Sequence, residues 1–233
     1  MKLRKMVLNI NGVDRIFMCD PENDRLSDVL RRLGLTGVKV GCGTGVCGSC
    51  SVILNGQVIR SCTKKITAVE EYSKITTIEG IGTPQHLHPL QVAWMHLGAV
   101  QCGFCVPGFI VSAYALLQEN PDPTREEVRE WFQKTRNVCR CTGYKQIVDA
   151  VMAAAKVMRG EFHNPEDGEY YGKPVVRQDA LGKVCGLADY GDDQALKMPQ
   201  GTLYAAIVQP KVAHHAKITA IHTEEAEKMP GVV

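Results

Sequence analysis

The sequence predicts an α+β protein in which a small sheet domain is followed by a helical domain. Three observations support this fold class. Strand-like runs flank one helical run within residues 7–78, a helical pattern without strand-like runs fills residues 89–159, and each region carries one set of four cysteines. We expect domains at residues 1–80 and 81–160, a linker at 161–183, and the start of a further α/β domain at 184–233.

The first cysteine set centres on a loop at residues 41–50, which holds three of the ten cysteines and four glycines. Its spacing, C-x4-C-x2-C-x11-C, is formed by Cys42, Cys47, Cys50 and Cys62. This is the plant-type ligand spacing of a [2Fe-2S] cluster. Glycines let such a loop take positive φ values, so that successive N–H groups face an anionic core. The first set therefore predicts an iron–sulfur site.

Two other interpretations fit parts of this loop. Residues 43–48 match G-x-G-x-x-G, but a dinucleotide-binding loop must open a helix, and a strand-like run follows here. Cys47 and Cys50 alone would suit zinc, although zinc sites more often pair two C-x2-C knuckles. The four-residue gap and the glycines favour iron and sulfide over zinc.

The elements around the loop predict a sheet crossed by one helix. We expect strands at residues 7–10, 14–18, 52–54, 57–61 and 75–78. Asn-Gly pairs at 11–12 and 55–56 predict two hairpin turns. The helix has Asp24 or Ser27 as its N-cap, Gly34 as its stop, and an apolar face of Leu26, Val29, Leu30 and Leu33. With a ligand loop at the sheet edge, this is a ferredoxin-like β-grasp arrangement.

The second region reads as a four-helix bundle. A composition break at residues 80–84 marks the expected boundary, and helices are expected at 89–97, 107–118, 124–135 and 144–158. Thr124 and Glu127 form a capping box at the start of the third helix. Aromatic residues at helical spacing are interpreted as its core, namely Trp94, Phe109, Tyr114, Trp131 and Phe132.

The second cysteine set consists of a C-x2-C pair and a C-x-C pair, each just before an expected helix. Helix N-termini favour anionic ligands, and loops at one end of a bundle can converge. A thioredoxin-like motif would need a βαβ context, which is absent, and zinc stays open although C-x-C is awkward for it. We expect a second [2Fe-2S] cluster, held by Cys102, Cys105, Cys139 and Cys141.

Beyond residue 160 the signals are weaker. Residues 160–183 are polar and broken by Gly and Pro, which predicts a linker. Strands are expected at 203–209 and 217–221, and a short helix at 223–229. His214 and His215 lack a patterned partner and are interpreted as turn residues, while Cys19 and Cys185 are interpreted as structural.

Composition narrows the class of protein. A net charge of +2 gives no reason to expect a nucleic-acid or membrane partner. No stretch approaches the length of a membrane span, and no apolar run of a secretory signal follows the basic N-terminus. Clustered cysteines then favour metal binding in a reducing compartment over disulfides. We therefore expect a cytoplasmic protein.

Three motifs resemble the N-terminal part of the xanthine oxidase family of molybdenum hydroxylases: residues 39–62, Gln-Cys-Gly-Phe-Cys-x-Pro-Gly at 101–108, and Cys-Arg-Cys-Thr-Gly-Tyr at 139–144. The resemblance covers essentially the whole chain. It implies that the first cysteine set binds a distal cluster and the second a proximal cluster, next to the pyranopterin that carries molybdenum. It also implies that Gln101 and Cys141 contact the pterin.

The segment after the bundle narrows this resemblance. Where other members insert a flavin domain, a short linker leads here to Val184-x-Gly186-x-x-Asp189-Tyr190, which looks like the opening of the molybdenum-binding portion. The arrangement is similar to flavin-free bacterial aldehyde oxidoreductases. One departure is Gly43, where relatives usually carry Glu after the first ligand. The lost charge could shift a cluster potential or a partner surface, but should not disturb ligation.

The resemblance implies the electron-transfer portion of an enzyme that oxidises aldehydes to carboxylic acids with water. Electrons would pass from the molybdenum–pterin cofactor, in its cytosine dinucleotide form, through both clusters to an external acceptor such as a flavodoxin or ferredoxin. Other implied partners are the rest of the molybdenum-binding portion, the aldehyde and a second copy of the chain. The catalytic base would lie beyond Val233, so no residue here is assigned to bond-making chemistry.

Three alternatives stay open. The first is an iron–sulfur subunit of a xanthine, nicotinate or carbon monoxide enzyme, although such a subunit would normally end near residue 160. The second is a free-standing ferredoxin-like carrier, which leaves the helical domain unexplained. The third is a structural zinc protein, which would be colourless. Iron and sulfide analysis with EPR separates them.

Overall fold

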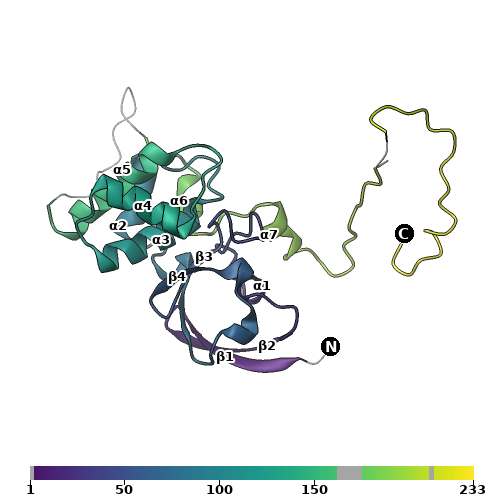
Figure 1. The fold of residues 1–233 in the computed structure, drawn as a ribbon, viewed down its shortest axis with the longest axis horizontal. Coiled ribbons are helices and arrows are strands. Elements are labelled where there is room, and N and C mark those ends of the chain that lie inside the picture. The colour runs from purple at the N-terminus through teal and green to yellow at the C-terminus, as the bar shows by residue number, and fades with distance from the viewer. Residues whose placement is uncertain (1–2, 162–174, 210–212) are drawn as a thin grey trace. The chain divides into compact units, whose positions relative to one another are not determined.

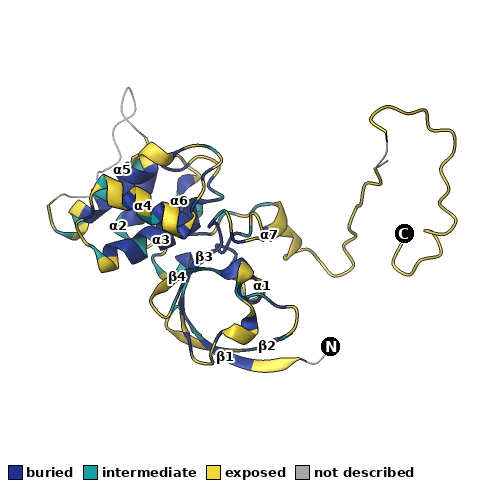
Figure 2. Cartoon of the chain, in the orientation of Figure 1, coloured by how far each residue is buried: buried dark blue, intermediate teal, exposed yellow. Residues whose placement is uncertain are grey.

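The computed structural model describes residues 3–161, 175–209 and 213–233. The chain divides into two compact units, Met1–Lys197 and Met198–Val233. All helices and strands of the described residues lie in the first unit (Figure 1). The buried residues also belong to that unit, whereas the second is exposed throughout its described part (Figure 2).

The N-terminal part is a five-stranded sheet in the order β2-β1-β5-β3-β4. The two hairpins are antiparallel, and β1 runs parallel to β5. Both expected Asn-Gly turns form, with positive φ at both residues of each turn, as a type I′ turn requires. The strands are β1 (Arg4–Ile10), β2 (Val13–Cys19), β3 (Ser51–Leu54), β4 (Gln57–Arg60) and β5 (Lys74–Thr76).

The expected helix is α1 (Leu26–Arg32), and it buries Leu26, Val29 and Leu30 in the sheet core, whereas Leu33 is its half-buried C-cap. The prediction of its N-cap was wrong. Arg25 takes that position, and its N–H donates to the Asp28 carboxylate at 2.8 Å. Asp24 instead accepts from the Arg32 guanidinium, which lowers the pKa of that carboxyl. The helix ends before Gly34, as expected, with Gly34 at a φ of 88°.

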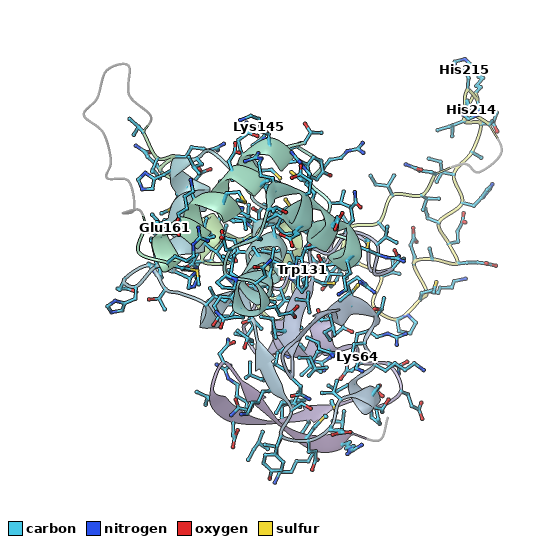
Figure 3. The ribbon with its side chains drawn as sticks, turned by 60° about the vertical axis from the view of Figure 1, so that its left-hand side comes forward. Lys64, Trp131, Lys145, Glu161, His214 and His215 are labelled. Carbon is cyan, nitrogen blue, oxygen red and sulfur yellow. The ribbon has the colours of Figure 1, made fainter. Side chains whose placement is uncertain are left out.

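The second part is all-helical, and each helix boundary lies within one residue of its prediction. The helices are α2 (Pro89–His96), α3 (Val106–Glu119), α4 (Arg125–Thr135) and α5 (Tyr144–Met158). Thr124 and Glu127 form the predicted capping box. Trp94, Phe109 and Phe132 are buried, while Tyr114 and Trp131 pack half-buried against them. The indole N–H of Trp131, which is labelled in Figure 3, donates to the Ser112 carbonyl; the two atoms are 2.8 Å apart.

Two short helices were missed, namely α6 (Ala180–Val184) and α7 (Gly191–Ala195). Helix α6 packs on α2 and α3, so this stretch belongs to the first unit. Most of the predicted linker, residues 162–174, lies outside the described residues.

The predicted strands and helix of the second unit were wrong. Residues 203–209 and 217–221 form no strand, and residues 223–229 form turns rather than a helix. Ile207 and Val208 are 86% and 96% exposed, so these apolar runs have neither a neighbouring strand nor a core to pair with. His214 and His215 are also exposed there, in a bend (Figure 3).

Candidate metal centres

The first cysteine set lies on the loop before β3 and on the 3₁₀ helix η1 (Ser61–Thr63), which follows β4. The loop turns through positive φ values at Gly43 (65°), Gly45 (75°) and Gly48 (66°). Glycine takes this conformation without strain. As a result, the N–H groups of Thr44 and Val46 donate to the Cys42 sulfur at 3.4 and 3.3 Å. The loop therefore directs backbone donors at a sulfur, as the sequence predicted.

The four thiols of this set differ in their tendency to ionise. Burial opposes ionisation of Cys42, but hydrogen bonds from Thr44, Val46 and Cys47 outweigh it and lower its pKa to about 6. Burial, aided by a hydrogen bond with Cys50, raises the pKa of Cys62 to about 12. Cys42 is exposed, whereas Cys50 and Cys62 are buried. The loop thus favours a thiolate on its exposed side and pairs two thiols on its buried side.

The second set lines one small cavity, in which the cysteines stand beside Gly103 and Gly143. Cys102 hydrogen-bonds with Cys141, and Cys105 with Cys139. Burial raises the pKa of Cys102 and of Cys105. The pKa of Cys141 is lowered, chiefly because the Cys102 N–H donates to its sulfur. All four predicted ligands of this set therefore meet in one place.

The thiols of the second set form a continuous row, in which Cys141 hydrogen-bonds with Cys102 and Cys139, and Cys139 also with Cys105. Among the residues that the structure describes, no three or more His, Cys, Asp or Glu side chains could hold a single metal ion together. A [2Fe-2S] cluster has four thiolates shared between two irons. Thiols in mutual contact, glycines in the walls and backbone donors aimed at sulfur fit a two-iron cluster at each site.

The two sites are joined by the main chain. The Val138 N–H donates to the Cys47 carbonyl at 3.0 Å, and Val138 directly precedes Cys139. Beside it, the Asn137 amide donates to the Gly48 carbonyl at 3.1 Å. One hydrogen bond and the intervening covalent bonds therefore connect a cysteine of the first set with a cysteine of the second.

Helix α3 presses closely on the same loop. A Cβ atom at Gly108 would lie 2.5 Å from the Gly48 carbonyl oxygen and 2.9 Å from that of Ser49. These are backbone atoms that cannot swing aside. Glycine at 108 therefore sets how closely the helical domain approaches the first cysteine loop.

We expect Gly108→Ala to destabilise the protein by about 1–3 kcal/mol, because a methyl group has no room there. The loss would occur although alanine is the better helix former. The measurement is the free energy of unfolding in urea. Gly191→Ala is the matched control, since no heavy atom lies within 4 Å of a Cβ there. Equal stability of the two variants would contradict the close packing.

Gln101 and Cys141, the residues expected at a pterin, lie together at the rim of the second site. The Gln101 amide donates to the Cys141 carbonyl at 3.3 Å. Gln101 is exposed and Cys141 is half-buried.

Cys19 and Cys185 are buried in the two hydrophobic cores, one in each domain.

Two side chains that the sequence analysis did not assign to the second site also reach it, and a third, Lys39, contacts one of them. Lys183 Nζ donates to the Gln101 carbonyl at 3.0 Å, and the Tyr190 hydroxyl donates to the Cys102 carbonyl at 2.8 Å. Lys39 Nζ lies 4.9 Å from the centre of the Tyr190 ring. Tyr190 belongs to the run interpreted only as the start of another domain. No local pattern could link these residues to the site, because 82 and 88 positions separate the bonded pairs.

Relatives share this arrangement at the level of sequence. The aldehyde oxidoreductase of Megalodesulfovibrio gigas is 56% identical over 97% of the chain and 26% of that protein. The nicotinate dehydrogenase small FeS subunit of Eubacterium barkeri is 45% identical over 64% of the chain and 93% of that subunit. The chain thus spans about a quarter of the aldehyde oxidoreductase and nearly all of the small subunit.

Solved structures share the fold. The aldehyde oxidoreductase from Desulfovibrio desulfuricans has a TM-score of 0.87 and 55% identity, over 97% of this chain and 26% of that one. The quinoline 2-oxidoreductase from Pseudomonas putida has a TM-score of 0.63 and 42% identity, over 70% of this chain and all of the compared chain. No helix in the described residues is long and apolar enough to cross a membrane.

Two family descriptions match consecutive parts of the chain. Residues 8–75 match the "2Fe-2S iron-sulfur cluster binding domain" and residues 77–152 match the "[2Fe-2S] binding domain". Fold and sites therefore define an iron–sulfur protein with two successive [2Fe-2S]-binding domains. With the relatives described above, the assignment becomes specific: the chain belongs to the xanthine oxidase family of molybdenum hydroxylases, as an N-terminal iron–sulfur region.

Proposed function

We propose that the chain is the electron-transfer portion of a molybdenum hydroxylase that oxidises aldehydes to carboxylic acids. The observation that carries this proposal is the match to aldehyde oxidoreductases over 97% of the chain, which extends well past the second cysteine set. The small FeS subunit matches only 64% of the chain. The stretch around α6 and α7, which packs on both iron–sulfur domains, therefore favours the aldehyde oxidoreductase type.

In this proposal the first cluster is held by Cys42, Cys47, Cys50 and Cys62, and the second by Cys102, Cys105, Cys139 and Cys141. When bound, such clusters accept and release single electrons at potentials that hydrogen bonds and exposure adjust. The thiols must lose their protons on binding. Backbone donors at Cys42 and Cys141 already favour their thiolates, so these two sulfurs are prepared for ligation.

The chain's own contribution to electron transfer is the connection between the two sites. The hydrogen bond from Val138 to the Cys47 carbonyl gives a short bonded route between the two cysteine sets. Gly48 and Gly108 keep that contact tight, because a side chain on either would meet backbone atoms within 3 Å. The proposed direction is from the second set to the first, whose Cys42 is exposed and can face an acceptor.

The remaining parts of the proposal concern partners. Gln101 and Cys141 lie at the rim of the second site, where they could contact a molybdenum–pterin cofactor of the cytosine dinucleotide form. The external acceptor would be a flavodoxin or ferredoxin, the location cytoplasmic, and the assembly a homodimer. The boundaries proposed for the parts stay at residues 1–80, 81–160, 161–183 and 184–233.

A second candidate is the iron–sulfur subunit of a related hydroxylase, favoured by the 45% identity to nearly all of a nicotinate dehydrogenase small subunit. The two candidates share both clusters and differ in substrate. Turnover of the purified full-length enzyme with aldehydes against nicotinate and xanthine decides between them. Aldehyde oxidation that exceeds the other activities is the expected result.

The test of the iron–sulfur assignment is independent of turnover. The purified protein should contain about four irons and four acid-labile sulfides per chain, and its reduced form should give two distinct EPR signals. A single cluster would instead support a ferredoxin-like carrier. A colourless protein that binds zinc without iron would overturn the proposal.

A further inference from the structure

The stretch from Lys183 to Asp193 covers the second cysteine site with two hydrogen-bond donors. Lys183 Nζ donates to the Gln101 carbonyl at 3.0 Å, and the Tyr190 hydroxyl to the Cys102 carbonyl at 2.8 Å. Both pack against Gly103, where a Cβ atom would lie 2.5 Å from Lys183 Cδ and 2.7 Å from the Tyr190 oxygen. Two consecutive carbonyls beside the site thus each receive a donor from this stretch.

The first of these carbonyls is linked directly to a cysteine sulfur. The Gln101 carbonyl and the Cys102 N–H belong to the same peptide group. That N–H donates to the Cys141 sulfur. A cation on the oxygen of a peptide group polarises the group and makes its N–H a stronger donor. The charge of Lys183 is therefore transmitted through one peptide group to a sulfur of the second set.

Tyr190 is held in place from several sides. Its ring lies edge-on to Phe104 at 5.1 Å, and Lys39 Nζ stands 4.9 Å from the ring centre. Its backbone N–H donates to the Asp193 carboxylate at 2.9 Å. The hydroxyl therefore has a fixed orientation toward the Cys102 carbonyl. That carbonyl shares a peptide group with the Gly103 N–H, on the wall of the cavity.

We propose that Lys183 and Tyr190 are positioning residues that raise the reduction potential of the second cluster through the peptide groups that follow Gln101 and Cys102. The inference rests on the proposed ligation of that cluster by the second cysteine set. Reduction adds negative charge to the cluster, and donors directed at its sulfurs stabilise that charge. Asp179, which pairs with Lys183 at 2.6 Å, offsets part of the effect.

The experiment is a redox titration of the cluster-loaded full-length protein, with the two clusters followed separately by EPR. At the solution potential where the wild-type second cluster is half reduced, Lys183→Met should lower its reduced-to-oxidised ratio about tenfold. For a one-electron couple this is about 59 mV. Tyr190→Phe removes one neutral donor and should lower the ratio about threefold. Lys183→Arg keeps the charge and should restore the wild-type ratio.

Two comparisons make the result specific. Lys197→Met removes a cation four residues after that stretch, where it pairs with exposed Asp189, and should change neither cluster. The first cluster should keep its potential in every variant. Equal shifts of both clusters, or a shift in Lys197→Met as large as in Lys183→Met, would overturn the inference.

The outcome for the wild type separates this inference from the proposed function. If the wild-type protein lacked a second cluster, the proposed function itself would fail. If it had two clusters and Lys183→Met left both potentials unchanged, only the positioning role would fail. If Lys183→Met did not take up the second cluster, the test would pass to Tyr190→Phe. An unchanged potential of the second cluster in Tyr190→Phe would then overturn the inference.

Discussion

Replacement of Cys105 by alanine is expected to abolish the second cluster and to leave the first intact. Cys105 lies at the start of α3, buried, and pairs with Cys139. Without it, one iron would keep a single thiolate, and the described residues that line this cavity include no fifth cysteine to replace it. Iron and sulfide should each fall by about half, to about two per chain, and one of the two EPR signals should disappear.

Two further variants complete this experiment. Cys50→Ala should give the reciprocal result, with loss of the other EPR signal. Cys185→Ala is the control, because Cys185 is also buried but lies in the hydrophobic core, where the Gln91 amide donates to its sulfur at 3.8 Å. It should retain both clusters. Two full signals in Cys105→Ala, or loss of a cluster in Cys185→Ala, would contradict the assignment of the second set.

Much of the first unit could be predicted because its signals are local. The first cysteine spacing fixes a loop length and a ligand type within residues 42–62, and the glycines supply the positive φ values that the loop needs. The Asn-Gly turns fix strand register, and the capping box of Thr124 and Glu127 fixes the start of α4. In each case the interacting residues are close in sequence, so the local sequence pattern is enough to predict their contact.

The second unit could not be predicted from the same rules. Leu203, Ile207 and Val208 have the composition of a strand, but a strand is stable only when another strand and a core cover it. These side chains are at least 66% exposed. The strand prediction therefore rested on residue propensity alone, although in the described part of the chain these residues lack a neighbouring strand and a core. The prediction of the N-cap of α1 failed for a related reason, because Asp24 pairs with the Arg32 side chain instead of the helix backbone.

The contacts that hold α7 on the first domain were equally hidden in the sequence. Charged residues usually lie at the surface, so Lys39 and Asp193 carry no sign that they are buried. In the fold each is 1% exposed, and their side chains pair at 2.7 Å across 154 positions of sequence. Only the tertiary structure brings together two residues so far apart. The long-range ion pair therefore had to be found in the structure.

Asp193→Asn is expected to destabilise the protein by about 3 kcal/mol, because it leaves the buried Lys39 ammonium without its carboxylate and leaves buried Arg31 with Asp192 alone. Asp193 accepts from Lys39 Nζ and from the Arg31 guanidinium, both at 2.7 Å. Burial already lowers the pKa of Lys39, with Asp193 acting against that shift. The measurement is the free energy of unfolding in urea. Asp189→Asn, which breaks an exposed pair with Lys197, should change it by less than about 1 kcal/mol.

The difference in unfolding free energy between the wild type and Asp193→Asn should depend on pH, because the Asp193 carboxyl titrates. Burial acts to raise its pKa, but Lys39, the Tyr190 N–H and Arg31 outweigh burial and lower it. The folded-state pKa therefore lies below the unfolded value of about 3.9, so the wild type's advantage should be complete above about pH 4 and shrink as the pH falls below it. Lys39→Met combined with Asp193→Asn should cost less than the sum of the single changes. Additive effects, or a pH-independent difference, would show that the buried carboxylate does not act through these cations.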